Sequence, residues 1–219
     1  MVRTKTIMKK FCILARDYEF HVPRDHDEND PKSSSIFRGL KSLANQTYKD
    51  FDLIICHDGP KEKTYEEEGI DFKELGLDPI IMNTPNRVQD YGHSSGDLAM
   101  QYAYQNNLGE YYIQFNIDNE FFPNALEILN NEIERHTEKL FVFAINHWKI
   151  PGREGLRFIG VPVIVGNVDA MQVVGHRDIW KEINFWHSKH PQLADGIIYE
   201  DMFKRFDWAE LPYCLGNNF

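Results

Sequence analysis

Short apolar runs alternate with amphipathic segments along the first half of the chain. The runs with the length of buried strands are residues 11–15, 51–56, 79–82 and 111–115. Between them, residues 36–44 and 97–107 place apolar side chains at helical spacing, and we also expect the charged segment 61–75 to be helical. Alternating strands and helices predict βαβ units with parallel strands.

The second half of the chain has a mixed pattern. Residues 124–136 have the spacing of an amphipathic helix, and further helices are expected at residues 177–185 and 199–206. Expected strands are residues 141–148, 158–165, 171–174 and 211–215. The whole pattern predicts an α/β sandwich of the Rossmann type, with a mostly parallel central sheet and a mixed C-terminal half.

Composition and charge exclude some classes of function. Of the 219 residues, 42% are hydrophobic and 26% are charged, which is typical of a globular chain. The net charge of −10 argues against a nucleic-acid-binding surface, which would be basic. Three scattered cysteines make a poor disulfide framework, and no apolar stretch approaches the ~18 residues of a membrane span. We therefore expect a cytoplasmic protein without a membrane span.

Acidic residues follow three of the expected strands. Asp17 follows the first strand, Asp58 the second, and residues 116–120 (NIDNE) the fourth. In an open α/β sheet, ligands bind beyond the carboxyl ends of the strands, so we expect these acids to share one edge. Asp58 can accept a hydrogen bond from a base or a ribose, although Asp-Gly is also a common turn.

Two further acidic pairs are candidates for chemistry. Asp118 and Glu120 point to the same side in extended backbone and can hold Mg²⁺ or Mn²⁺. Glu200 and Asp201 include a candidate general base. Both pairs have an alternative explanation, since carboxylates are also favoured near helix N-termini.

Three stretches together resemble the family-2 glycosyltransferases of the GT-A fold. FRGLKSLANQTYKDFDLIICHDGP (residues 37–60) is similar to the N-terminal signature of that family. GEYYIQFNIDNEFFPNALEIL (residues 109–129) resembles the strand, the metal-binding DxD-type motif and the helix that follows it. YEDMFKRF (residues 199–206) resembles the segment with the catalytic base. The resemblance spans about residues 11–206.

The resemblance implies an inverting, hexosyltransferase-type enzyme with one GT-A-like domain over residues 1–219. A nucleotide-sugar-binding half would cover about residues 11–122, and an acceptor-binding half about residues 123–219. The donor would be a nucleotide sugar, UDP-linked in our interpretation, and the acceptor a glycan or another hydroxyl compound.

The resemblance also assigns roles to single residues. Ala15, Asp17 and Asp58 would lie near the nucleotide. Asp118 would bind the diphosphate and its Mn²⁺ or Mg²⁺, with Glu120 as the second acid of the motif. Asp201, or Glu200, would be the catalytic base. Trp186 and Gln172 are candidates for the acceptor site, Trp186 because indole rings stack on sugars.

The sequence departs from the family pattern at two positions. His57 stands where family members carry Asp, and Ile117 stands where they often carry Asp. A non-catalytic domain that binds sugar nucleotide or glycan therefore stays open as an alternative. A nucleotidyltransferase is less favoured, because the residues after the first strand are not a Gly-rich basic loop.

Overall fold

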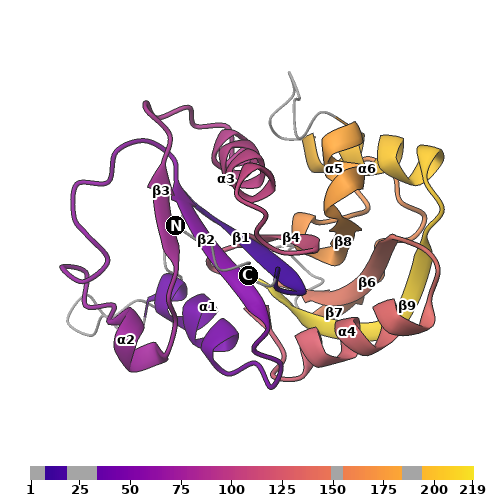
Figure 1. The fold of residues 1–219 in the computed structure, drawn as a ribbon, viewed down its shortest axis with the longest axis horizontal. Coiled ribbons are helices and arrows are strands. Elements are labelled where there is room, and N and C mark those ends of the chain that lie inside the picture. Colours follow the sequence, from indigo (N-terminus) through magenta and orange to yellow (C-terminus); the bar gives the residue numbers. More distant parts are fainter. Residues whose placement is uncertain (1–7, 19–33, 149–154, 184–193) are drawn as a thin grey trace, which may run out of the picture.

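A curled, mixed sheet of nine strands forms the centre of the computed structural model, which describes residues 8–18, 34–148, 155–183 and 194–219 (Figure 1). The strand order is β3-β2-β1-β4-β8-β6-β9-β5, and β7 pairs with β6 at the side. Figure 1 shows helices on both faces of this sheet, which is the sandwich that the sequence pattern predicts.

The first half of the chain builds the parallel part of the sheet. Its elements are β1 (Phe11–Asp17), α1 (Ser35–Ala44), β2 (Phe51–His57), α2 (Phe72–Leu75), β3 (Ile80–Asn83), α3 (His93–Gln105) and β4 (Tyr111–Asn116). Alternate residues of β1 pack on opposite faces, so that Ile13 packs with Leu40 and Leu43 of α1, while Leu14 packs with Met100 of α3. The carboxyl ends of β1, β2 and β4 therefore open at one edge.

The second half extends the sheet with both strand directions. Its elements are β5 (Glu120–Phe121), α4 (Ala125–Arg135), β6 (Leu140–His147), β7 (Leu156–Phe158), the 3-10 turn η2 (Ala170–Gln172), β8 (Val173–His176), α5 (Arg177–Glu182), α6 (Ala194–Arg205) and β9 (Ala209–Asn218). β8 runs antiparallel to both β4 and β6, so β6 and β9 point in the same direction as β4.

Several predicted elements differ from the observed ones. The predicted helix at residues 61–75 is wrong for most of its length, because Gly69 adopts a positive φ of 82° and only Phe72–Leu75 is helical after the Asp71 cap. The predicted strand at residues 158–165 is also wrong. It ends at Phe158, since Gly160 has φ of 77° and Pro162 has no N–H to donate. α6 begins at Ala194, five residues before the predicted start.

A glycine lets α1 touch the loop at the end of β4. A Cβ atom on Gly39 would overlap the carbonyl oxygen of Ile117 and lie 2.9 Å from that of Asn119. The helix therefore supports the backbone of residues 117–119 directly, and with it the acids that the sequence predicts at this edge.

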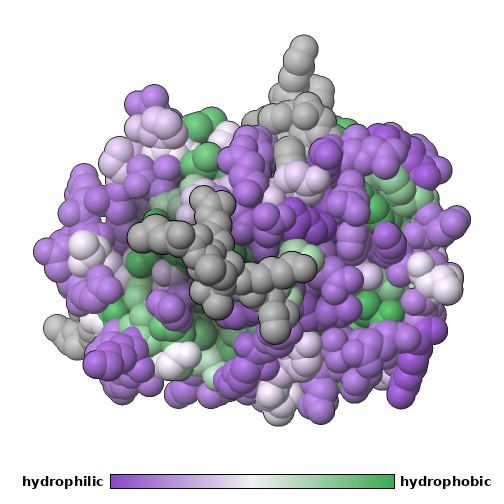
Figure 2. All heavy atoms as spheres, viewed as in Figure 1, coloured by the Kyte–Doolittle hydropathy of each residue, from purple (hydrophilic) through white to green (hydrophobic). Residues whose placement is uncertain are grey.

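The surface is largely polar. In the view of Figure 2, hydrophilic side chains predominate and hydrophobic ones gather in separate small areas. Within the described ranges, every helix is too short or too polar to cross a membrane.

Candidate functional site

A buried arginine joins four elements at the carboxyl edge of the sheet. Arg16, near the end of β1, is only 2% exposed. Its Nε donates to Oδ1 of Asn116 on β4 at 3.0 Å, and its Nη1 lies 3.1 Å from Nδ1 of His93, the first residue of α3. The same Nη1 lies 3.5 Å from a carboxylate oxygen of Asp195 on α6. We call Arg16, His93, Asn116 and Asp195 the Arg16 cluster.

The charge of Arg16 sets the state of its neighbours. Burial alone would lower the pKa of Arg16, but the charge of Asp195 and other nearby groups raises it, so the guanidinium stays charged. Because an arginine can only donate hydrogen bonds, Nδ1 of His93 accepts and its proton is on Nε2. His93 is thereby held between the guanidinium of Arg16 and the carboxylate of Asp195.

Asp195 is the acid of α6 that faces the strands. With 100° of rotation per residue, Asp195 shares a face with Tyr199 and Met202, both fully buried, while Glu200 and Asp201 lie on other faces. One oxygen of Asp195 faces both Arg16 and His93 at 3.5 Å, and a quarter of the side chain remains exposed. The acid can therefore contact both the buried cluster and a ligand.

Tyr18 lies among three acids from different parts of the chain. Burial raises its pKa, Arg16 lowers it, and the charges of Asp118, Asp169 and Asp195 raise it further. The contacts of Arg16 bring two of these segments together, since the N–H of Ile117 after β4 donates to the Arg16 carbonyl at 3.1 Å and Asp195 at the start of α6 lies 3.5 Å from its guanidinium. This convergence is the central feature of the site.

Asp17 and Ala15 are held inside the sheet edge. Asp17 is 3% exposed and accepts a 2.7 Å hydrogen bond from the hydroxyl of Tyr65. Burial and the charge of Asp17 together raise the pKa of that tyrosine. Ala15 is fully buried between Ile55 and Phe115, so only the backbone at this position is near the edge.

Asp58 organises the loop that leads into α3. Its two carboxylate oxygens accept the backbone N–H groups of Val88 at 2.9 Å and Gln89 at 2.8 Å. Gly59 allows this loop to approach, since a Cβ atom there would lie within 3.0 Å of Arg87. Oδ1 also accepts from the hydroxyl of Thr84 at 3.3 Å, whereas Oδ2 keeps a further lone pair with which Asp58 can accept a hydrogen bond from a ligand.

The acids of the predicted metal motif have different surroundings. Asp118 is 7% exposed and contributes to the convergence around Tyr18. Glu120 instead faces Arg38, whose Nε lies 3.5 Å from one carboxylate oxygen, while Asn217 donates to the other at 3.0 Å. Among the described residues there is also no group of three or more His, Cys, Asp or Glu side chains that fits a metal ion. Glu120 is thus held by Arg38 and Asn217, whereas Asp118 is buried just after β4.

The other predicted site residues do not join this convergence. Asp201 is 58% exposed and pairs with Arg205 at 3.1 Å, one turn along the helix. Glu200 pairs with Lys204 at 2.6 Å and accepts the backbone N–H of Val165.

Of the two predicted acceptor residues, the structure describes Gln172. The side-chain amide of Gln172 is used internally. It donates to the carbonyls of Phe143 and Phe158 and accepts from the N–H of Asp169, so it is not available to an acceptor. Trp186 lies outside the described residues.

Sequence reasoning did not identify Arg16 and Asp195 as site residues. An arginine inside an apolar strand is a signal, because arginine is almost never fully buried without partners. Asp195 would have required the true start of α6, since the helix register decides which acid faces inward.

Comparison with solved structures supports the fold. TarS 1–349 of S. aureus in complex with UDP superposes with a TM-score of 0.71 and 13% identity, over 95% of this chain and 60% of TarS 1–349. The complex of TarS 1–349 with UDP-GlcNAc superposes with a TM-score of 0.69 and 13% identity, over 95% of this chain and 58% of that one. Mannosyltransferase PcManGT of Pyrobaculum calidifontis, in complex with GDP-Man and Mn²⁺, superposes with a TM-score of 0.63 and 8% identity. The match covers 97% of this chain and 57% of PcManGT.

These matches confirm the fold class that the sequence predicts. The chain has a GT-A-like fold, and it spans about three fifths of the length of these structures. No protein-family model matches the chain, and no match is found among curated proteins.

Replacing Arg16 tests whether the Arg16 cluster holds the two halves together. Arg16→Met removes a buried charge and leaves Asp195 and Asn116 without their donor, so we expect the free energy of unfolding to fall by about 3 kcal/mol. Arg205→Met is the matched control, because its pair with the exposed Asp201 is worth less than about 1 kcal/mol. Urea unfolding of both variants measures the difference, and equal losses would contradict a stabilising role for the cluster.

Proposed function

We propose that this chain is a glycosyltransferase domain that transfers a sugar from a nucleotide sugar to a hydroxyl acceptor. The observation that carries the proposal is that the Arg16 cluster, which includes Asp195, contacts the end of β4 just before Asp118, at the carboxyl edge of a GT-A-like sheet. Solved structures with this fold hold UDP, UDP-GlcNAc and GDP-Man. We propose a UDP-linked donor, as the sequence resemblance implies.

Donor binding is assigned to the ends of β1 and β2. Asp58 would accept a hydrogen bond from the base or the ribose through a free lone pair, and its bonds to Val88 and Gln89 hold the loop beside it in place. Asp17 lies next to it, since the N–H of Asp58 donates to the carbonyl of Asp17 at 2.9 Å.

The base is assigned to Asp195. Its carboxylate would take the proton from the acceptor hydroxyl, whose oxygen then attacks the anomeric carbon from the face opposite the diphosphate. One new C–O bond forms as the C–O bond to the diphosphate breaks, so the anomeric carbon is inverted. Arg16 would hold the carboxylate toward the strand ends, and one oxygen of Asp195 stays directed away from solvent.

Asp118 would hold Mn²⁺ or Mg²⁺ together with the diphosphate oxygens of the donor. When bound, such a cation neutralises charge that develops on the leaving diphosphate. One or two carboxylates plus substrate phosphates are a common ligand set for Mg²⁺, so the loss of Glu120 from this set is chemically acceptable. We assign Glu120 a structural role, because it pairs with Arg38 and accepts a hydrogen bond from Asn217.

A non-catalytic domain that binds sugar nucleotide is the second candidate. It is favoured by Ile117 and by the neutralisation of Glu120 by Arg38, which leave a single acid in the motif. Both candidates predict nucleotide binding, and turnover separates them.

A thermal-shift experiment combined with a UDP-release assay tests the proposed function. At a nucleotide concentration about a hundredfold above Kd, UDP with Mn²⁺ should raise Tm by roughly 5–10 °C, whereas GDP and CMP should have a smaller effect. UDP release from a panel of UDP-sugars and acceptors should then depend on the acceptor. Stabilisation without turnover would support the non-catalytic domain, and no stabilisation by any nucleotide would contradict both.

Substitution of the two acids of α6 tests the assignment of the base. Asp195→Asn should lower kcat by about 10²–10⁴-fold, because proton transfer is lost, while UDP binding by calorimetry stays within a few-fold. Asp201→Asn serves as the control and should retain most of the activity, since its side chain pairs with Arg205 on another face. If Asp201→Asn lowers kcat and Asp195→Asn does not, then Asp201 is the base.

Metal dependence tests the division of roles between Asp118 and Glu120. Asp118→Asn should abolish the extra stabilisation that Mn²⁺ gives to the UDP complex, because the cation loses its carboxylate ligand. Glu120→Gln should keep that extra stabilisation, with Tm lowered for the free protein through the loss of the Arg38 pair. Thermal shift with and without Mn²⁺ measures both. Equal loss in the two variants would make Glu120 a ligand after all.

A further inference from the structure

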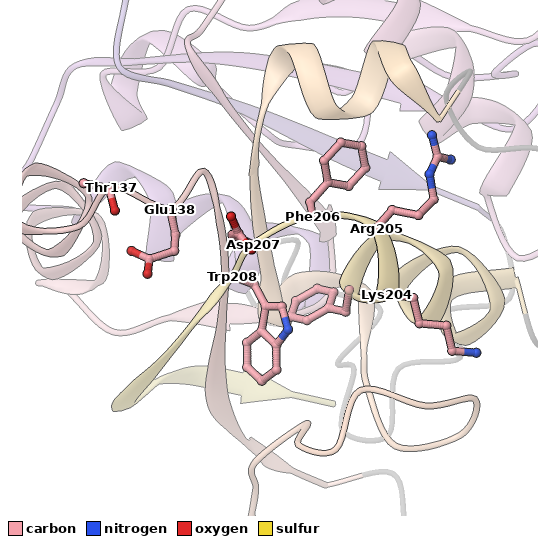
Figure 3. Close-up of a pocket in the computed structure, with 8 residues that line it drawn as sticks. Thr137, Glu138, Lys204, Arg205, Phe206, Asp207 and Trp208 are labelled. Atoms are coloured by element: carbon pink, nitrogen blue, oxygen red, sulfur yellow. The ribbon is translucent and has the colours of Figure 1, made fainter.

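A cavity lies at the opposite edge of the sheet from the candidate site. It has a volume of about 440 Å³, and its walls come from the α4–β6 loop and from the end of α6 with the turn into β9 (Figure 3). The lining residues are Thr137, Glu138, Phe203, Lys204, Arg205, Phe206, Asp207 and Trp208. Leu140 at the start of β6 and Tyr112 near the start of β4 both pair with Gly175, which places this cavity at the amino ends of the parallel strands.

Aromatic rings form part of the lining. Trp208 is 36% exposed, and its ring is tilted by 51° against Phe203 at a centroid distance of 5.0 Å. Phe203 supports the indole from the protein side, while more than a third of Trp208 stays open to solvent. A tryptophan fixed in this way offers a rigid, amphipathic contact surface.

The cations of the lining are already neutralised by acids outside it. Lys204 pairs with Glu200 at 2.6 Å, and Arg205 pairs with Asp201 at 3.1 Å. In Figure 3 the amino group of Lys204 and the guanidinium of Arg205 both point away from Trp208. An anionic ligand would therefore find little unpaired positive charge here.

The remaining polar groups are suited to hydroxyl groups. Glu138 and Asp207 contribute carboxylate acceptors, and Thr137 a hydroxyl that both donates and accepts. The indole Nε1–H of Trp208 donates. In the part of the chain that the structure describes, Asp207 and Trp208 Nε1 make no hydrogen bond or ion pair. A ligand can therefore use Asp207 and the indole N–H without breaking an existing contact, whereas Glu138 already pairs with Nδ1 of His136 at 3.2 Å.

We propose that this cavity binds a neutral carbohydrate, with one sugar ring on Trp208 and its hydroxyl groups on Asp207 and Glu138. A sugar presents C–H groups to an aromatic ring and hydroxyl donors to carboxylates at the same time. A phosphate would be repelled by the two carboxylates, and an apolar ligand would cover Asp207 without giving it a partner. The cavity volume lies within the range of small-ligand sites.

This site is separate from the proposed transfer site and does not depend on it. Along α6, the cavity residue Phe203 lies eight residues after Asp195, which is roughly 12 Å at the rise of an α-helix. The cavity would therefore hold a glycan at a distance from the sugar that reacts, and its ligand class follows from its own lining.

Calorimetric titration with neutral oligosaccharides tests the inference. The probes are tri- to pentasaccharides of glucose, mannose and N-acetylglucosamine, titrated into the whole chain without nucleotide. At least one should bind, and both Trp208→Ala and Asp207→Asn should weaken that binding by about tenfold. Trp148→Ala is the matched control, because Trp148 is similarly exposed at 39% but lies at the other end of β6, and it should leave this binding unchanged.

Two outcomes would overturn the inference. One is that no oligosaccharide of the panel binds to the wild-type chain, and the other is that binding is the same in Asp207→Asn and Trp208→Ala as in the wild type. Asp207 is exposed, so its variant should fold even if the loss of Trp208 disturbs the turn. UDP stabilisation measured on the same samples separates a failure of this site from a failure of the proposed function.

Discussion

A charged guanidinium buried in a strand is the constraint on which the rest of this structure depends. Removing the Arg16 charge from water is costly unless hydrogen bonds and an opposite charge compensate it. The compensation comes from Asn116 on β4, His93 on α3 and Asp195 on α6. The two hydrogen-bond partners are 77 and 100 residues away in the sequence, so the strands of the first half and the helix α6 of the second half must be positioned together.

The same constraint fixes the rotation of α6. Once Asp195 faces Arg16, the helical repeat turns Glu200 and Asp201 outward, where Lys204 and Arg205 pair with them. Close packing on the other side leaves little freedom, because a Cβ atom on Gly196 would lie 2.6 Å from the Cα atom of Val165. An acidic pair that resembles a catalytic motif therefore stabilises the helix surface, and the acid at the start of the helix faces the site.

The sequence predicts the parallel strands and their common edge well, because apolar runs and the acids after them are local features. β1, β2 and β4 each extend one or two residues beyond their apolar run, and the fold class is confirmed. What the sequence does not show is the pairing of distant polar groups. The sequence around Glu120 does not indicate that this acid pairs with Arg38, which belongs to an earlier helix. The sequence around Asp195 likewise does not indicate that α6 starts before Tyr199.

The pairing of Glu120 has a consequence for how a donor would bind. Glu120 and Asn217 connect β5 to β9, and Asn218 on β9 donates to Asp169, so the last strand closes the sheet beside Asp118. Asp118 is then the carboxylate of the motif that remains to bind a cation in our proposal. A hard cation needs several oxygen ligands, and a nucleotide diphosphate would supply those that the protein does not. Each would therefore bind more tightly in the presence of the other, and by linkage the gain must be the same in both directions.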